Sequence, residues 1–229
     1  MITERSSQEE NQFAKDIYEA TLLVLTDKLP QQTDALFLHG RSYGDDEGLF
    51  ELVSQLYKDG RIKSVIIPGT DGRRHGASIP GEAWPGQKAW MKKLKELGVD
   101  KVHLSDPGYN TRTETDSFLK ASSEKGWKSV AVLTQPHQIL RAMLGTVKSM
   151  EERNTWIRVY ALIPPNTSWG SEVFGSQGEK SLPRIDHIKE ELVRIHRYQE
   201  KGDLASFEQL FMYIAVRNAT EETPADIKF

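Results

Sequence analysis

The sequence contains no cysteine. This absence excludes thiolate catalysis, iron–sulfur clusters, cysteine-ligated zinc and disulfide bonds. Long apolar runs are missing too, because no stretch approaches the roughly 20 residues that span a bilayer, and the N-terminal segment lacks the apolar core of a signal peptide. We therefore expect a cytoplasmic protein with no membrane partner.

An excess of one charge is also missing. The chain has 30 Lys and Arg against 33 Asp and Glu, which gives a net charge of −3 and a pI near 6.1. Domains that bind nucleic acid are usually strongly basic, so this balance predicts no nucleic-acid partner. With 229 residues, of which 38% are hydrophobic, the chain is long and apolar enough for one globular domain with a substantial core.

Short β-rich segments alternate with longer segments of helical periodicity. The five predicted strands are residues 35–38, 64–67, 101–104, 129–133 and 156–161. Two of them are continuously apolar, which is typical of parallel strands covered on both faces. The helical segments between them are long enough to cross over a sheet. The pattern predicts an α/β fold with a Rossmann-like doubly wound sheet of about five parallel strands.

The predicted domain occupies residues 34–163 and has additions on both sides. Residues 1–33 carry an amphipathic helix that is expected to pack on the core. Residues 164–183 are rich in Pro, Gly and Ser, which predicts a lid or connecting loop whose Trp169 and Phe174 either anchor it in the core or stack on a ligand. Residues 184–229 are expected to form a C-terminal helical hairpin, with its first apolar stripe at Ile185, Ile188, Leu192 and Ile195.

Polar residues gather directly after the predicted strands, where open α/β sheets bind their ligands. The candidate ligand-binding residues there are Gly40, Arg41, Ser42, Gly69, Thr70, Asp71, Arg73, Arg74, Asn110, Thr111, Thr134, Gln135, Gln138 and Arg141. The loop that holds Arg73 and Arg74 also contains three glycines, so it suits an anion such as a phosphate or carboxylate. A solvated surface loop is the alternative.

The sequence lacks the motifs of two common enzyme classes. The first loop has only two glycines, four positions apart, and so does not match the Gly-x-Gly-x-x-Gly fingerprint of dinucleotide-binding enzymes. No Gly-x-Ser-x-Gly elbow is present, which disfavours an ordinary serine hydrolase. No His-x-x-x-His or Glu-x-x-His pair on a helix indicates a preorganised metal site, and no metal is predicted.

The predicted helix that starts near Thr111 begins in a segment with two interpretations. Thr111 and Glu114 have the spacing of a capping box, in which two side chains satisfy backbone N–H groups for roughly 1 kcal/mol of stability. In the functional alternative, Asn110 and Glu114 face the cleft at a helix N-terminus, where the helix dipole favours an anion.

Two of the six histidines stand out. His39 and His137 follow predicted strands on the ligand side, where an imidazole can act as an acid, a base or a hydrogen-bond donor. By contrast, His103, His187 and His196 lie inside a predicted strand or helix and are expected to be structural or solvated.

Several segments together resemble the YdcF-like family, which includes the SanA and ElyC envelope proteins and is built on domain of unknown function 218. The segments are Asp34-Ala-Leu-Phe-Leu-His-Gly40, Ser64-Val-Ile-Ile-Pro-Gly69, Leu97-Gly-Val99, Asn110-Thr-x-x-Glu114 and Leu133-Thr-Gln-Pro-His-Gln-Ile-Leu-Arg-Ala142. Their order and spacing over residues 34–160 carry the resemblance.

The resemblance implies a Rossmann-like fold whose polar cleft holds an adenosyl ligand such as S-adenosylmethionine. It assigns cleft roles to Gly69, Asn110, Thr111, Glu114, Thr134 and Arg141. The chain departs from the family at Gln138, where a histidine is common, and at His39, where the family usually has glycine. His39 or His137 is expected to supply the displaced imidazole.

The predicted function is the binding of a small anionic or adenosyl-containing ligand at the carboxyl ends of the strands, with group transfer or hydrolysis as the expected activity. Glu114, His39 and His137 are the candidate catalytic residues. Two alternatives stay open. One is a noncatalytic module that binds a ligand or a partner, and the other is a metal-dependent phosphate-ester hydrolase that uses Asp71, His75 and Glu114. The sequence does not decide the oligomeric state.

Overall fold

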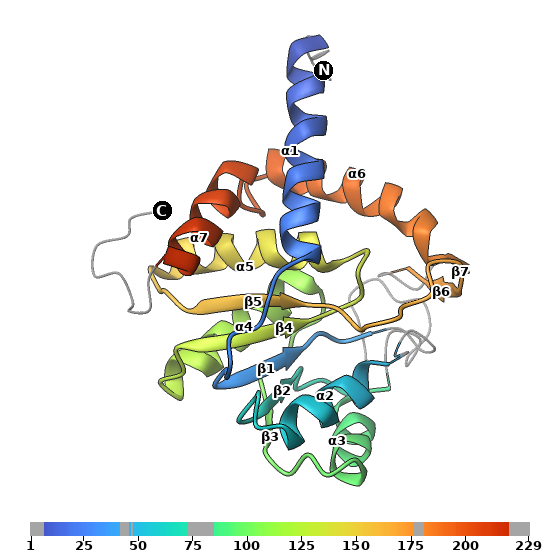
Figure 1. Ribbon diagram of the computed structural model, residues 1–229, viewed down its shortest axis with the longest axis vertical. Coiled ribbons are helices and arrows are strands. Elements are labelled where there is room, and N and C mark those ends of the chain that lie inside the picture. Colours follow the sequence, from blue (N-terminus) through green and yellow to red (C-terminus); the bar gives the residue numbers. More distant parts are fainter. Residues whose placement is uncertain (1–6, 42–45, 47, 73–84, 176–180, 220–229) are drawn as a thin grey trace.

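The computed structural model describes residues 7–41, 46, 48–72, 85–175 and 181–219 of the chain (Figure 1). Seven α-helices, one short 3-10 helix and seven strands lie in these ranges. In chain order they are α1 (Ser7–Leu25), β1 (Ala35–Leu38), α2 (Leu49–Lys58), β2 (Val65–Ile67), α3 (Gln87–Glu96), β3 (Val102–Leu104), α4 (Thr111–Glu124), β4 (Ser129–Leu133), α5 (Ile139–Arg153), β5 (Arg158–Leu162), β6 (Glu172–Phe174), β7 (Ser181–Pro183), η1 (Arg184–Asp186), α6 (His187–Glu200) and α7 (Phe207–Ala219).

Five parallel strands form the main sheet, in the order β3-β2-β1-β4-β5. At its centre, Leu36 pairs with Val65 on one side and with Ala131 on the other. The sheet order reverses between β1 and β4, which is the switch point of a doubly wound fold. The predicted Rossmann-like α/β fold is confirmed. The last strand begins two residues later than predicted, because its pairing with β4 starts at Arg158.

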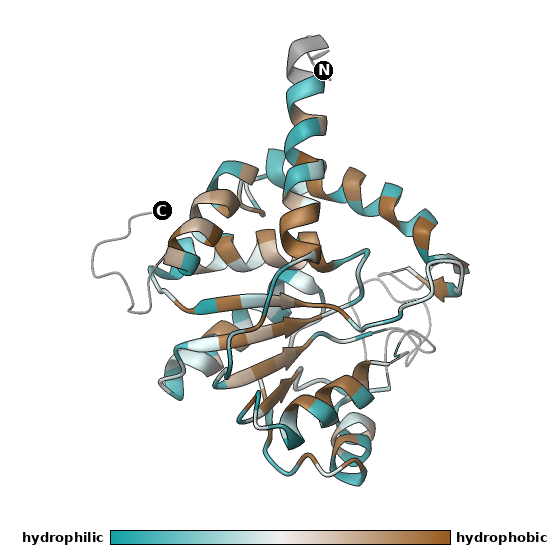
Figure 2. Cartoon of the chain, in the orientation of Figure 1, coloured by the Kyte–Doolittle hydropathy of each residue, from teal (hydrophilic) through white to brown (hydrophobic). Residues whose placement is uncertain are grey.

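Each face of the sheet packs into its own core. Ala35 and Phe37 of β1 belong to a first core with side chains of α1, α4, α5 and α7. Leu36 and Leu38 belong to a second core with α2 and α3. Successive strand residues point to opposite faces, so burial on both faces requires an unbroken apolar run. Figure 2 shows these strands as hydrophobic segments between the helices.

The N-terminal helix α1 packs on the first core as expected. Its apolar side chains Ile17, Ala20 and Val24 are buried there. The helix ends at Leu25, within the predicted N-terminal segment of residues 1–33. Its first turns project beyond the body of the domain (Figure 1).

The segment predicted as a lid or loop contains regular structure. β6 and β7 form an antiparallel ribbon, with Val173 paired to Leu182. Val173 is buried, whereas Phe174 is 43% exposed, so Phe174 does not anchor the segment in the core. The missed signal is the short alternation Glu172-Val173-Phe174, which is too brief to stand out among glycines and prolines.

The buried face of α6 differs from the predicted stripe. His187, Glu191 and Ile195 are its buried residues, at the i, i+4, i+8 spacing of one helix face, whereas Ile185 is 50% exposed. Ile188 and Leu192 of the predicted stripe are only partly buried, whereas two polar side chains, His187 and Glu191, lie on the buried face. They face the carboxyl edge of the sheet, where their partners lie.

Candidate functional site

The carboxyl edge of the sheet collects buried polar side chains from consecutive loops. His39 and Arg41 follow β1, Thr70 follows β2 and Thr134 follows β4, and all four are buried. Because parallel strands end at the same edge, the chain brings these residues together as predicted. Buried polar groups are normally hydrogen-bonded. The hydrogen-bond partners of these side chains therefore show how the site is built.

His39 and Glu114 form a buried pair at this edge. The His39 Nδ1 lies 2.8 Å from Glu114 Oε2. The loop before α4 fits tightly against Glu114, because a Cβ at Gly108 would lie 2.8 Å from the Glu114 Cα and Cγ atoms. This glycine permits the close approach that holds the carboxylate against the imidazole.

The helix cap at α4 is formed by other residues than the sequence predicted. Asn110 is the N-cap, and its Oδ1 accepts a hydrogen bond of 3.0 Å from the Thr113 amide. Thr113 Oγ1 in turn accepts a hydrogen bond from the Asn110 amide. The predicted capping pair of Thr111 and Glu114 is therefore wrong by one residue. The Glu114 carboxylate is directed to His39 instead.

The Nε2 atom of His39 is available to accept a hydrogen bond from a ligand. A carboxylate accepts hydrogen bonds, so Nδ1 carries the proton and Nε2 presents its lone pair. His39 Nε2 is buried and has no hydrogen-bond partner in the described part of the chain. Burial lowers the pKa of His39, and the charges of Arg41 and Arg141 act in the same direction, whereas Glu114 opposes the shift. The net effect lowers the pKa of His39 and favours the neutral imidazole.

Arg41 contacts the loop after β4, the strand that pairs with β1. Its Nη2 donates a hydrogen bond of 2.5 Å to Thr134 Oγ1, and Thr134 in turn lies 3.4 Å from Gln138 Oε1. Three of the predicted ligand-binding residues therefore form one chain of contacts. Arg41 is only 1% exposed, so it places a positive charge inside the edge of the domain.

Arg141 links three helices at the same edge. Its Nη1 donates to Thr111 Oγ1 at 2.6 Å, and its Nε donates to Glu191 Oε2 at 2.5 Å. Burial alone would raise the pKa of Glu191, but the guanidinium groups of Arg141 and Arg194 hold that pKa below its ordinary value. Sequence reasoning missed Glu191. The polar pair His187 and Glu191 within a helical stripe is the signal that points to it.

His137 lies buried beside the ribbon and α6. Its ring centroid is 5.5 Å from that of His187. Neither ring nitrogen of His137 has a hydrogen-bond partner among the described residues, and burial lowers the pKa of His137 to about 3. His187 differs, because its Nε2 lies 2.9 Å from the Val173 carbonyl oxygen and fixes β6 to α6. The expected structural role of His187 agrees with this contact.

A cavity of about 320 Å³ opens beside the start of α4. The residues that line it are Asn110, Thr111, Arg112, Thr113, Arg141, Gly145, Tyr198, Asp203 and Leu204. It therefore includes three residues to which the sequence assigned ligand contacts. Arg141 lines this cavity and is held in place by its ion pair with the buried Glu191. A ligand in the cavity would therefore contact a guanidinium group whose orientation is fixed.

The remaining predicted site residues differ in their burial, and some lie outside the described residues. Gly40 and Gln135 are buried at the edge, whereas Asp71 is exposed. Gly69 allows β2 and β3 to end close together, because a Cβ there would lie 2.2 Å from the Ser105 carbonyl oxygen. The predicted anion loop of Arg73 and Arg74 lies outside the described residues, as do Ser42 and His75.

The arrangement suits acid–base chemistry on an anion. A base held by a carboxylate, with guanidinium groups close by, is the combination that removes a proton and balances the negative charge that develops. Within the described residues, no group of three His, Asp or Glu side chains is placed to hold a metal ion. In the same ranges, no helix is both long and apolar enough to cross a membrane.

Comparisons with known proteins add little to this geometry. No family model and no curated protein matches the chain. Two solved structures of pantothenate synthetase from Thermus thermophilus are similar, each with a TM-score of 0.37. They are 12% and 11% identical to this chain, cover 90% of it, and are themselves covered over 81% and 82% of their length. A likeness of this strength carries no functional argument, so the class of the protein rests on its own sheet and site.

Proposed function

We propose that the carboxyl edge binds a small anionic molecule and that His39, oriented by Glu114, acts on it as a general base. The observation that carries the proposal is His39 Nε2, which is buried and without a partner in the described chain while Nδ1 is held at 2.8 Å by Glu114. A buried polar atom without a partner is uncommon in proteins, and a bound ligand is one way to satisfy it. The activity would be group transfer or hydrolysis.

The charge of the site favours an anion. Arg41, Arg141 and Arg184 are buried together with Glu114 and Glu191, and the charge of each acts on His39 or His137. Guanidinium groups thus outnumber carboxylates among the described buried residues. A charge in a site that excludes water acts more strongly than one on the surface, so a phosphate or carboxylate gains most there.

The finer proposal for the ligand is an adenosyl compound such as S-adenosylmethionine, in which the carboxylate is the one anionic group that the guanidinium groups would hold. It rests on the resemblance to the YdcF-like family, which stays a prediction. The metal-hydrolase alternative relies on Asp71, His75 and Glu114, of which Asp71 is exposed and Glu114 is bound to His39. The noncatalytic alternative shares the binding site and differs only in the absence of turnover.

The test begins with thermal melting against S-adenosylmethionine, S-adenosylhomocysteine, nucleotides, sugar phosphates and inorganic phosphate. A ligand at about 100 times its dissociation constant stabilises by about 2.7 kcal/mol. A ligand that shifts the melt is then assayed for turnover with two variants of α4. Glu114→Gln removes the charge beside His39, and Glu124→Gln makes the same change at the exposed end of the helix.

We expect Glu114→Gln to keep ligand binding and to lose turnover by about 10²-fold or more, whereas Glu124→Gln behaves as wild type. Turnover should rise with pH through the lowered pKa of His39 and then level off, because the neutral imidazole is the active form. Equal turnover of the two variants would overturn the role of His39 as a base. A melt that no anion shifts would overturn the binding site itself.

A further inference from the structure

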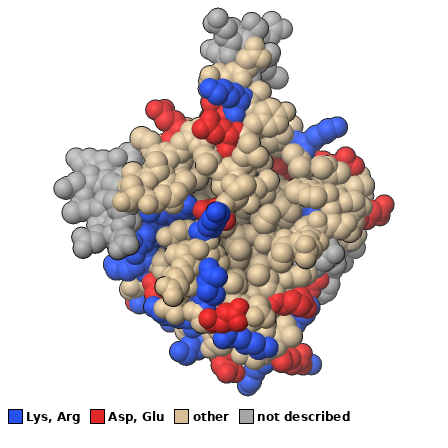
Figure 3. Space-filling view, in the orientation of Figure 1, with Lys and Arg blue, Asp and Glu red and all other residues tan. Residues whose placement is uncertain are grey.

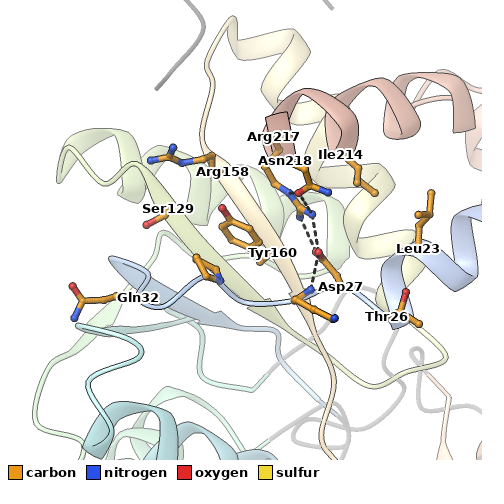
Figure 4. Close-up of a pocket in the computed structure, with 12 residues that line it drawn as sticks. Leu23, Thr26, Asp27, Gln32, Ser129, Arg158, Tyr160, Ile214, Arg217 and Asn218 are labelled. Carbon is orange, nitrogen blue, oxygen red and sulfur yellow. Dashed lines mark hydrogen bonds and ion pairs between the residues drawn. The ribbon is translucent and has the colours of Figure 1, made fainter. Parts of the chain in front are cut away.

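A pocket at the amino edge of the sheet, where the strands begin, is lined by polar side chains that already contact one another. Its volume is about 730 Å³. Figure 4 shows Asp27 bonded to Arg217, whose Nη1 and Nη2 each donate to it at 2.7 Å. The same guanidinium lies 4.5 Å from the centroid of the Tyr160 ring. The carboxylate and the ring are therefore engaged, whereas buried imidazole nitrogens without partners in the described chain occur at the carboxyl edge.

One of these imidazoles, that of His137, has no part in the proposed function. His137 lies in the loop between β4 and α5 and is only 6% exposed. Neither its Nδ1 nor its Nε2 has a hydrogen-bond partner among the described residues. A neutral imidazole has one N–H donor and one lone pair, so both positions are open to a partner. A ligand that fills one of them would explain why a buried side chain is left without bonds.

The first turn of α5 follows directly after His137. Gln138 is the N-cap residue of α5, and in the described structure its side chain makes no cap hydrogen bond, unlike that of Asn110 at the start of α4. The first N–H groups of a helix have no partner within the helix, and the positive end of the helix dipole favours an anion. The helix start and the buried imidazole are thus two neighbouring sources of hydrogen-bond donors.

The charges near His137 also favour an anion. The guanidinium groups of Arg41 and Arg184 act on His137 against a single carboxylate, that of Glu191, which is itself bonded to Arg141 at 2.5 Å. Burial lowers the pKa of His137 to about 3, so its imidazole is a neutral donor at pH 7. On the face shown in Figure 3, exposed Lys and Arg side chains gather at the centre and left, away from the strand ends at the right in Figure 1. An anion at the carboxyl edge would therefore meet buried charges.

We propose that His137 and the first turn of α5 bind the anionic group of the ligand, with the imidazole N–H donating to one of its oxygens. The assignment rests on the proposed function and separates two roles at this edge. His39 takes the proton from the loop after β1, and His137 holds the anion from the loop after β4. These loops are neighbours, because the His39 amide donates to the Leu133 carbonyl oxygen at 3.2 Å. The ligand class is then a phosphate or carboxylate that carries a hydroxyl or amine as a separate group.

The test uses inorganic phosphate, which supplies the anion without the rest of a substrate. The imidazole nitrogen resonances are recorded by NMR while phosphate is added, and their loss in His137→Leu identifies the signals of His137. His103→Leu makes the same change at a partly exposed position of β3 and is the matched control. The dissociation constant of phosphate is then measured for wild type, for both variants and for His137→Gln, whose amide keeps an N–H donor.

We expect phosphate to shift the His137 signals of wild type, and His137→Leu to bind phosphate at least about tenfold more weakly. His137→Gln should keep part of the affinity that His137→Leu loses, and His103→Leu should bind as wild type. His137 signals that phosphate does not move, or equal affinities of His137→Leu and His103→Leu, would overturn the site.

Failure of this site and failure of the proposed function give different results. If His137→Leu binds phosphate as wild type while Glu114→Gln loses turnover, the anion site at α5 is wrong and the base at His39 stands. If phosphate shifts the His137 signals while Glu114→Gln and Glu124→Gln turn over equally, the anion site stands and the role of His39 is wrong.

Discussion

The two edges of the sheet both bury charged and polar groups, but they treat them differently. At the amino edge, Asp27 accepts four hydrogen bonds, and Tyr213 Oη both accepts from the Val159 amide and donates to the Ile157 carbonyl oxygen. At the carboxyl edge, His39 Nε2 and both nitrogens of His137 are buried without partners in the described chain. Saturated groups stabilise a fold, whereas unsaturated ones reduce its stability and indicate ligand binding.

This difference between the two edges can be tested by removing single polar groups at each edge and measuring the free energy of unfolding. If the amino edge is structural, its substitutions destabilise strongly. If the carboxyl edge keeps bonding capacity for a ligand, replacing an unsaturated group there with an apolar one is tolerated.

The largest effect is expected for Asp27→Asn. The side chain of Arg217 is 1% exposed, and this substitution leaves its charge buried without a carboxylate. Removing one partner of a buried ion pair costs about 3–5 kcal/mol. Urea unfolding measures the difference. Asp59→Asn, on the exposed end of α2, is the control and should change stability by less than about 0.5 kcal/mol. A loss below about 1 kcal/mol for Asp27→Asn would contradict a structural amino edge.

A smaller loss is expected for Tyr213→Phe. The substitution removes the hydroxyl that accepts from the Val159 amide at 2.6 Å and leaves that amide buried without its partner. Loss of such a bond costs about 1–3 kcal/mol. Chemical denaturation of the variant, compared with Tyr18→Phe at a position 71% exposed, measures it. Equal stabilities of the two variants would mean that the hydroxyl contributes nothing.

The smallest effect at pH 7 is expected for His137→Leu at the carboxyl edge. A buried imidazole without partners in the described chain contributes little, so stability should change by less than about 1 kcal/mol or rise. The pH dependence is the sharper measurement. Burial lowers the pKa of His137 to about 3, so between pH 6.5 and that value the unfolded chain binds a proton that the folded chain does not. Wild-type stability therefore falls as the pH falls through this window.

His137→Leu removes that proton uptake and should gain about 2 kcal/mol relative to wild type on going from pH 7 to pH 5. Tyr213→Phe does not change a group that titrates in this window and should keep the wild-type slope. A His137→Leu protein with the same pH slope as wild type would show that folding does not lower the pKa of His137.

Much of the architecture was predictable from the sequence because it depends on periodicity. The runs at residues 35–38 and 129–133 are the observed β1 and β4, since only apolar residues are tolerated where both faces are buried. The ribbon of β6 and β7 was not predicted. Strands of three residues are held by their mutual pairing and by His187, and an alternation of only three residues is too short to indicate a strand.

The location of the candidate site was predictable from the sequence, but the hydrogen bonds and ion pairs within it were not. His39, Glu114 and Arg141 were identified because they follow strands or open a helix. The capping interpretation paired Glu114 with Thr111, and the apolar stripe predicted for the C-terminal helix left Glu191 out. Both errors have the same origin, because a pattern of residue types does not contain the partner of a polar side chain.

The sequence by itself determined the α/β class, the parallel sheet, the edge at which polar residues gather and the chemistry that the absence of cysteine excludes. Tertiary structure alone decided which polar groups meet. His39 and Glu114 are 75 positions apart, and Arg141 and Glu191 are 50 apart. Such pairs form only when packing brings distant elements within about 3 Å. The same packing decided which of the described nitrogens were left without a partner, and therefore where a ligand is expected to bind.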